Sequence, residues 1–305
     1  MVLEGIYAPI PTPFDAASGD ILPGAMEENV TRWAVTTLDG LVVCGSNGEL
    51  PFVSMDERAS LVRAAKNAVA RAKSGMNIIA GTFMNATRDA IECCKVCEGA
   101  GADAALMLPP HYFKASGMVG ARKFFEDVAN ASPIPVVLYN MPANTGVNID
   151  AATIKQLSAH PNIIGVKDTS GDMTQMGYIA NDHHENFSVF CGSGNYFLPA
   201  LSLGASGGTL AVANLYPESA RFLLQAYVRG ENEEARKLQY RLMSASDLLT
   251  RQYGVPGIKA AMDRAGLYGG PCRAPMGDLP DDAKRKLFES LDATGLEEYE
   301  KWRLG

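Results

Sequence analysis

The sequence predicts a single (β/α)8 barrel, or TIM barrel, with additional C-terminal helices. Short apolar, β-branched runs alternate with longer amphipathic runs along most of the chain, which indicates β-α-β units feeding a parallel sheet. There are eight apolar runs, and their continuous apolar character is typical of strands covered on both faces. The chain has 305 residues, and a barrel of this kind takes about 250 residues as one domain.

The eight apolar runs are the expected strands of the barrel. They cover residues 6–10, 40–44, 78–81, 104–108, 135–139, 163–167, 188–191 and 207–211. The first of them runs into Pro9, Pro11 and Pro13. A doubly wound sheet is the other fold with this alternation, but it usually places a phosphate loop after its first strand. The prolines therefore favour the barrel.

Amphipathic segments between these strands are the expected helices. They cover residues 54–73, 87–99, 115–131, 151–159 and 217–229. Ser54 is followed three residues later by Glu57, which predicts a capping box at the start of the first of these helices. The alternation stops at Gly230, and helical patterns broken by glycine and proline follow. We therefore divide the chain into a barrel, residues 1–229, and a helical extension, residues 230–305, packed on it as one structural unit.

Composition excludes several classes of function. The net charge is -7, the pI is near 5.2, and no run of lysine or arginine occurs, which argues against a nucleic-acid partner. The first ten residues lack a basic segment followed by an apolar one, and no window reaches the ~20 apolar residues that a membrane span needs. We expect a cytoplasmic protein without a membrane partner.

The six cysteines lack the regular spacing of a secreted disulfide framework, so we expect reduced thiols. Cys94 and Cys97 form a C-x-x-C pair, but neither a second pair nor a spaced histidine pair follows. A zinc or redox site is therefore not expected, and no metal is predicted.

Reactive side chains are expected at the carboxyl ends of the strands, where barrel enzymes carry their active sites. Lys167 ends the sixth apolar run, which places its amine at the barrel mouth, ready to attack a carbonyl. Tyr139 ends the fifth, so its phenol should stand beside Lys167 and relay protons. A solvated strand-end lysine and a packing tyrosine are the alternatives.

Two loops after strands are further candidates. Residues 45–49, Gly-Ser-Asn-Gly-Glu, follow the second strand, and their N–H groups can converge on a carboxylate. A tight turn stabilised by Ser46 and Asn47 is the alternative. Tyr112 follows the fourth strand and could be a second phenol of the relay. For its neighbour His111 we expect a loop hydrogen bond rather than a role as base.

Together these motifs resemble the dihydrodipicolinate synthase and N-acetylneuraminate lyase family of pyruvate-dependent class I aldolases. The likeness runs from residue 6 to about residue 279. Residues 45–49 look like the carboxylate loop of the family, residues 139–146 like its tyrosine motif, and residues 167–172 like its Schiff-base motif.

The resemblance implies a role for each matching residue. Lys167 would form a Schiff base with pyruvate and Tyr139 would transfer protons, while Ser46 and Asn47 would hold the pyruvyl carboxylate. Thr209 matches a residue whose backbone carbonyl faces the lysine. No metal or organic cofactor is implied.

The resemblance also implies an assembly. Homotetramers built as a dimer of dimers are usual in the family. Tyr112 matches a tyrosine that reaches into the site of a neighbouring subunit, so we expect a homotetramer.

Within the family, the likeness is greatest to 4-hydroxy-2-oxoglutarate aldolase. Residues 269–275, Gly-Gly-Pro-Cys-Arg-Ala-Pro, contribute to it, but they lie outside the active-site motifs and indicate lineage rather than chemistry. Asn144 stands where the synthase of lysine biosynthesis normally has an arginine, so a fixed positive charge is missing. Asn144, Asn47 and Thr169 are the expected hydrogen-bonding groups for the other end of the substrate.

The leading hypothesis is reversible cleavage of 4-hydroxy-2-oxoglutarate to pyruvate and glyoxylate. One alternative is 4-hydroxy-tetrahydrodipicolinate (dihydrodipicolinate) synthase, which joins pyruvate to aspartate semialdehyde. Another is cleavage of a 2-keto-3-deoxy sugar acid. A barrel that has lost catalysis and serves as a scaffold is disfavoured, because lysine, tyrosine and carboxylate loop are all present.

Overall fold

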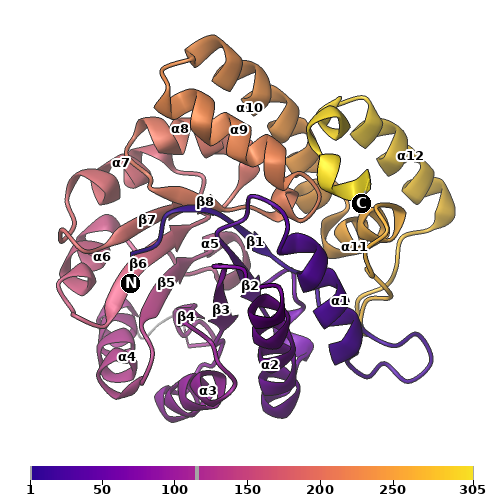
Figure 1. Cartoon of the computed structure of the whole chain (residues 1–305). Helices are drawn as coiled ribbons and strands as arrows, with labels where there is room; N and C mark the ends of the chain where they lie inside the picture. The colour runs from indigo at the N-terminus through magenta and orange to yellow at the C-terminus, as the bar shows by residue number, and fades with distance from the viewer. Residues whose placement is uncertain (1, 114–116, 305) are drawn as a thin grey trace.

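A computed structural model describes residues 2–113 and 117–304 of the chain. Eight parallel strands follow one another in chain order and close into a barrel, with β8 pairing with β1. Helices surround the strands, and further helices follow at the C-terminal end (Figure 1). The predicted (β/α)8 barrel with C-terminal helices is confirmed.

The strands are short, and nearly all of their residues are buried. They are β1 (Gly5–Pro9), β2 (Gly40–Val43), β3 (Asn77–Gly81), β4 (Ala104–Met107), β5 (Val136–Asn140), β6 (Ile163–Asp168), β7 (Ser188–Cys191) and β8 (Gly207–Thr209). Burial on both faces explains the continuous apolar runs in the sequence. The strand predicted over residues 207–211 ends earlier, because a 3-10 helix, η4 (Ala211–Asn214), begins directly after it.

The barrel helices occupy the amphipathic segments. They are α1 (Pro23–Trp33), α2 (Met55–Arg71), α3 (Thr87–Gly99), α4 (Gly117–Ala131), α5 (Pro142–Thr145), α6 (Ala151–Ser158), α7 (Met173–Asn181), α8 (Phe197–Ser202) and α9 (Pro217–Val228). The predicted start of α4, at residue 115, lies outside the described residues. The capping box of α2 is confirmed, because Ser54 Oγ accepts the Glu57 N–H and the Glu57 carboxylate accepts the Ser54 N–H.

Short helical turns complete the barrel loops. They are the 3-10 helices η1 (Leu50–Phe52) and η3 (Gly194–Tyr196). The longer C-terminal elements are α10 (Asn232–Asp247), the π-helix η5 (Leu248–Gln252), α11 (Gly254–Arg264) and α12 (Asp281–Asp292). Figure 1 shows α11 and α12 on the side of the molecule where α1 lies. No helix in the described part of the chain is long and apolar enough to cross a membrane.

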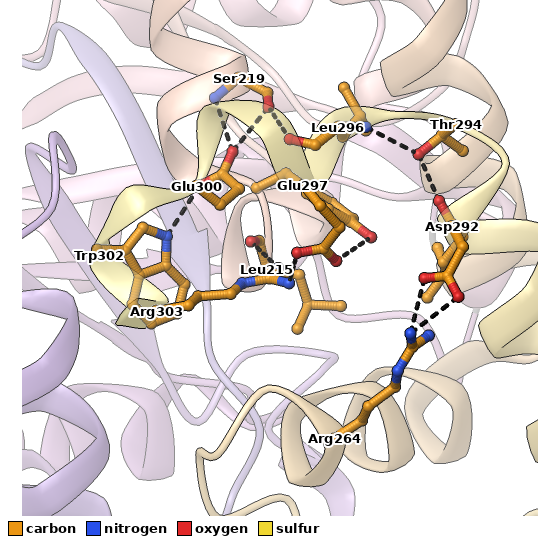
Figure 2. Close-up of polar contacts among 12 residues, drawn as sticks. Leu215, Ser219, Arg264, Asp292, Thr294, Leu296, Glu297, Glu300, Trp302 and Arg303 are labelled. Carbon is orange, nitrogen blue, oxygen red and sulfur yellow. Dashed lines mark hydrogen bonds and ion pairs between the residues drawn. The ribbon is translucent and has the colours of Figure 1, made fainter. Parts of the chain in front are cut away.

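The last described residues form two 3-10 turns, η6 (Leu296–Tyr299) and η7 (Lys301–Leu304), which fold back onto α9. Between them, the buried carboxylate of Glu300 accepts hydrogen bonds from the Ser219 N–H at 2.9 Å and the Ser219 hydroxyl at 2.7 Å (Figure 2). It also accepts the Glu218 N–H, at 3.3 Å. Trp302 Nε1 also donates to it, at 2.8 Å. Tyr216, the residue before α9, supplies no side-chain cap. Glu300, which lies far along the chain, therefore accepts the free N–H groups of the first turn of α9.

The six cysteines are free, and Cys93, Cys94 and Cys97 are buried on one helix, α3. Within the residues that the structure describes, no group of three or more histidine, cysteine or acidic side chains could hold a metal ion.

Candidate active site

Lys167 and Tyr139 lie side by side at the carboxyl ends of neighbouring strands. They are register partners between β5 and β6, and the Lys167 Nζ lies 4.1 Å from the centre of the Tyr139 ring. Lys167 is 5% exposed and Tyr139 is 4% exposed. A lysine amine so largely withdrawn from water, beside a phenol, is the arrangement that nucleophilic catalysis by an amine requires.

The hydroxyl of Ser46 joins this pair from the loop after β2. Its Oγ lies 3.3 Å from the Tyr139 hydroxyl. Burial raises the pKa of Tyr139, but the Lys167 ammonium and the hydrogen bond with Ser46 outweigh it and bring the pKa below its ordinary value. Tyr139 therefore gives up its proton more readily than an ordinary tyrosine, which suits a group that relays protons.

The 45–49 loop turns sharply between two residues with left-handed backbone. Cys44 has φ +54° and Glu49 has φ +56°, a conformation that residues other than glycine seldom adopt. The Gly48 N–H donates to the Gly45 carbonyl and the Glu49 N–H to that of Ser46. The backbone N–H groups of Ser46 and Asn47 donate to no group among residues 2–113 and 117–304. Two adjacent free N–H groups form a small anion-binding concavity.

The Asn47 side chain attaches the loop to the end of β1. Its amide donates to the Pro9 carbonyl at 3.2 Å, and the Thr12 hydroxyl donates to the Gly48 carbonyl at 2.7 Å. Asn47 therefore offers its backbone N–H to a ligand, while its side chain stabilises the turn. The functional and the turn-stabilising interpretations of this motif are compatible.

Thr169 presents a hydroxyl near the same phenol. It helps to lower the Tyr139 pKa, although its geometry falls short of a well-formed hydrogen bond and no other described group pairs with it. Gly192 leaves the room that this side chain needs, since a Cβ there would lie 1.9 Å from Thr169 Oγ1. The Thr169 hydroxyl is thus buried beside the phenol without a hydrogen-bond partner among the described residues.

A buried carboxylate network that sequence reasoning missed holds the ends of β5 and β6. Asp168 is fully buried and accepts hydrogen bonds from the Asn140 amide at 2.8 Å and from the Ser170 N–H and hydroxyl at 2.9 and 2.5 Å. Gln175 of α7 donates to it at 3.2 Å. Asp168 follows Lys167 directly and Asn140 follows Tyr139, so alternation along a strand places the network behind the reactive pair. In the sequence, the network could have been inferred from Asn140 and Asp168, two polar residues that end neighbouring apolar strands.

Two other predicted site residues make no hydrogen bond to Lys167 or Tyr139 in the described chain. Asn144 is exposed on α5, and its backbone N–H donates to the Met141 carbonyl. Thr209 is buried at the end of β8, where it pairs with Tyr7 of β1.

Tyr112 lies largely in solvent and contacts neither Lys167 nor Tyr139 through a hydrogen bond among the described residues. It is 77% exposed and packs edge-to-face on Phe113, which is 79% exposed, with ring centres 5.0 Å apart. The backbone N–H groups of His111 and Tyr112 donate to the Asn85 side chain. The His111 ring stacks on Phe83, and its Nδ1 lies 3.4 Å from the Pro109 carbonyl, which agrees with the predicted loop hydrogen bond.

A closed parallel barrel with a buried lysine at the end of its sixth strand defines a class of enzyme, the carbon-carbon lyases of the class I aldolase type. Within that class, the chain belongs to the dihydrodipicolinate synthetase family, which matches residues 2–294.

Curated relatives are similar to the chain over almost its whole length. It is 32% identical to a 4-hydroxy-tetrahydrodipicolinate synthase of Methanothrix thermoacetophila, over 96% of this chain and 99% of the relative. It is also 32% identical to a protein of the same name from Leptospira biflexa, over 95% and 97%. Neither carries the name 4-hydroxy-2-oxoglutarate aldolase, so the family is shown and the predicted branch has no specific support.

Solved structures agree with the fold. The dihydrodipicolinate synthase of Cyanidioschyzon merolae with lysine bound superposes with a TM-score of 0.91 at 30% identity, over 96% of this chain and 98% of that one. YagE, a prophage protein of the same family from E. coli K12 solved in complex with pyruvate, gives a TM-score of 0.89 at 28% identity, over 97% and 100%.

Proposed function

We propose that this protein makes or breaks a carbon-carbon bond between pyruvate and an aldehyde through a Schiff base at Lys167. The observation that carries the proposal is the buried Lys167 amine, 4.1 Å from the centre of the Tyr139 ring, whose hydroxyl meets Ser46. The pyruvate complex of the similar protein YagE supports the choice of 2-oxo acid.

In this proposal the 45–49 loop binds the carboxylate of the 2-oxo acid. The free N–H groups of Ser46 and Asn47 and the Ser46 hydroxyl are the donors. Because the Ser46 hydroxyl is next to the Tyr139 phenol, a carboxylate held here brings the neighbouring C2 ketone toward Lys167. Fixing the ketone beside the amine removes most of the entropic cost of their encounter.

The chemistry then follows from the amine and the phenol. The Lys167 ammonium first gives up a proton and its free amine attacks C2, and the carbinolamine then loses water as Tyr139 supplies a proton to the departing oxygen. In the condensation direction, a proton leaves C3 and the resulting enamine attacks the aldehyde carbon. In the cleavage direction, the C4 hydroxyl loses its proton, the C3–C4 bond breaks, and its electrons move into the iminium. In the cleavage direction, the resulting enamine then takes up a proton at C3. In either direction, water finally hydrolyses the imine and releases the 2-oxo acid.

Two aldehyde partners each have an observation in their favour. The names of the curated relatives favour aspartate semialdehyde and therefore the synthase reaction, which the sequence ranked as an alternative. Asn144 counts against aspartate semialdehyde and so leaves cleavage of 4-hydroxy-2-oxoglutarate open, because an exposed amide supplies no fixed positive charge in place of the arginine that binds the carboxylate of aspartate semialdehyde in the synthase. The comparisons weigh toward the synthase reaction, and Asn144 is the residue that distinguishes the two.

Trapping with borohydride tests the Schiff base directly. Pyruvate and borohydride should add the mass of a reduced pyruvyl group to the peptide that contains Lys167, and Lys167→Ala should abolish both this mass and catalysis. Lys155→Ala is a matched control, because Lys155 is a surface lysine paired with Asp182. Activity retained by Lys167→Ala, or a label on another lysine, would contradict the proposal.

A substrate panel identifies the aldehyde. Pyruvate release from racemic 4-hydroxy-2-oxoglutarate and from 2-keto-3-deoxygluconate should be measured beside condensation of pyruvate with aspartate semialdehyde. Preference for condensation supports the synthase reaction. Preference for 4-hydroxy-2-oxoglutarate supports the aldolase and a specificity role for Asn144, and Asn144→Arg should then shift activity toward aspartate semialdehyde.

We also propose that the protein works as a homotetramer in the cytoplasm. The exposed, mutually packed rings of Tyr112 and Phe113 support a subunit contact, because large apolar groups seldom lie together in water. Sedimentation velocity should show a tetramer that Tyr112→Asp weakens. A monomeric parent chain would contradict this assembly.

A further inference from the structure

Glu49, the last residue of the 45–49 loop, forms a buried ion pair with Lys259 of α11. Glu49 Oε1 lies 2.5 Å from Lys259 Nζ, and the two side chains are 0% and 2% exposed. Glu49 Oε1 accepts no hydrogen bond of good angular geometry, so its contact with the Lys259 ammonium is an ion pair. A loop proposed to bind the substrate is thus tied to a helix of the C-terminal extension.

Further groups of the C-terminal extension complete the surroundings of this pair. Glu49 Oε2 accepts the backbone N–H of Arg273 at 2.8 Å, and Lys259 Nζ donates to the Pro271 carbonyl at 2.6 Å. Lys259 Nζ also lies 4.7 Å from the centre of the Phe14 ring. Residues 269–275, which in the sequence indicated only lineage, therefore hold the active-site loop.

The Arg273 side chain extends the same attachment to the chain that follows the loop. Its guanidinium donates to the Phe52 carbonyl at 2.6 Å and pairs with Glu57 at 2.6 Å. The Gly19 carbonyl accepts a further hydrogen bond from it, at 2.7 Å. Both the loop and the start of α2 are therefore fixed to the C-terminal extension.

The backbone of Glu49 shows what the ion pair maintains. Its φ of +56° is left-handed, and a residue with a side chain stays in that region only when its surroundings determine it. The turn at Glu49 closes on Ser46, because the Glu49 N–H donates to the Ser46 carbonyl at 3.2 Å. The direction of the free Ser46 and Asn47 N–H groups depends on that turn.

We propose that Glu49 and Lys259 are positioning residues that fix the 45–49 loop and thereby set the affinity for the carboxylate of the 2-oxo acid. The inference rests on the proposed function, because it requires the N–H groups of Ser46 and Asn47 to bind that carboxylate. These donors hold the carboxylate equally before and during the reaction. Loss of the ion pair should therefore weaken binding and leave the rate of the bound complex nearly unchanged.

The competing explanation is that the ion pair supports only the fold. The two explanations can be separated because a buried ion pair can often be replaced by uncharged residues without loss of stability, whereas removal of one partner is costly. The double variant Glu49→Gln with Lys259→Met leaves neither charge buried alone. It should recover the thermal stability that each single variant loses.

The test measures the rate of borohydride trapping of Lys167 against pyruvate concentration, which needs no knowledge of the aldehyde. We expect the double variant to melt near the parent chain and to require about tenfold more pyruvate for half-saturation, with a maximal trapping rate within about twofold. Asp292→Asn is the control, because it removes an ion pair with Arg264 that is largely exposed. It should leave both parameters unchanged.

A stable double variant with the half-saturation value of the parent would overturn the inference, since the pair would then serve the fold alone. If the double variant fails to fold, Lys259→Met is judged by the same criterion. The parent chain separates the two proposals. Absence of any label on Lys167 would overturn both, whereas a labelled Lys167 with an unchanged half-saturation value would overturn only the positioning role.

Discussion

Tyr139 is the residue to which we assign proton transfer, because its ring lies against the Lys167 amine and its hydroxyl is 3.3 Å from the Ser46 hydroxyl. Sequence reasoning could find it, since an aromatic residue that ends an apolar strand next to a strand ending in lysine must face the same rim. It also named Thr169 as a site residue, but it could not show that the Thr169 hydroxyl lies near this phenol, because the space for that side chain is left by Gly192 from another strand end.

Replacement of the phenol should slow the chemistry without unfolding the barrel. Tyr139→Phe keeps the ring against Lys167 and removes the proton donor, so we expect kcat to fall by about 10²- to 10⁴-fold. The Tyr139 pKa is lowered, so the basic limb of the pH-rate profile should begin below the value for an ordinary tyrosine and disappear in the variant. Tyr178→Phe, at an exposed position, is the control. A variant with parental kcat would show that the phenol is not the relay.

The space at Gly192 gives a prediction about stability. A Cβ there would lie 1.9 Å from Thr169 Oγ1 and 2.7 Å from the Asp168 carbonyl, so Gly192→Ala should displace both and cost about 1–3 kcal/mol by urea unfolding. Gly177→Ala is the matched control, because the nearest atom to its Cβ would be 3.6 Å away and alanine favours the helix. Equal stabilities of the two variants would refute this account.

At the scale of elements, the positions of the strands and of α2, α3, α4, α6 and α9 followed from the period of the hydrophobic residues, whereas α1, α5, α7 and α8 were not predicted. The observed strands differ from the predicted ones by at most two residues at an end. What the period could not reveal is how distant elements meet. Arg273 and Glu49 are separated by 224 positions, and their contact depends on where the C-terminal helices pack. The division of the chain at residue 230 stays a prediction. Contacts such as those of Glu49 with Lys259 and Arg273 join the extension to the barrel loops.

Asp168 connects β5, β6 and α7, and its charge should matter to all three. In Asp168→Asn the amide brings its own donors toward the Asn140 amide and the Ser170 N–H, so at least one buried donor loses its partner. We expect a loss of about 1–3 kcal/mol in the free energy of unfolding, together with slower trapping of the adjacent Lys167. Asp182→Asn, at an exposed ion pair, should change stability by less than about 0.5 kcal/mol. A larger loss of stability in Asp182→Asn than in Asp168→Asn would show that the network does not support the site.

At the scale of the whole molecule, Glu300 makes stability depend on pH. Burial raises its pKa to about 7, against the hydrogen bonds from Ser219, Trp302 and Glu218, so the folded chain keeps this proton to a higher pH than the unfolded chain does. The stability that this proton contributes is complete below the ordinary carboxyl pKa and is lost as the pH rises through 7. The lost stability is roughly 3 kcal/mol at most.

Glu300→Gln should therefore flatten the pH dependence of unfolding between about pH 5 and pH 8. The measurement is the free energy of unfolding in urea across that interval, with Glu298→Gln as the control at an exposed carboxyl. The slope of the control should match that of the parent. Parallel slopes for the parent and Glu300→Gln would assign the pH dependence to other groups.

The contacts of Glu49 also bear on the order in which the protein matures during synthesis. The 45–49 loop leaves the ribosome early, yet Lys259 and Arg273, which fasten it, are translated only after all eight strands. A nascent chain that has completed β8 therefore still lacks the groups that hold this loop. In the proposed function, full affinity for the carboxylate of the 2-oxo acid is acquired only after the chain through Arg273 has been translated and has docked on the barrel.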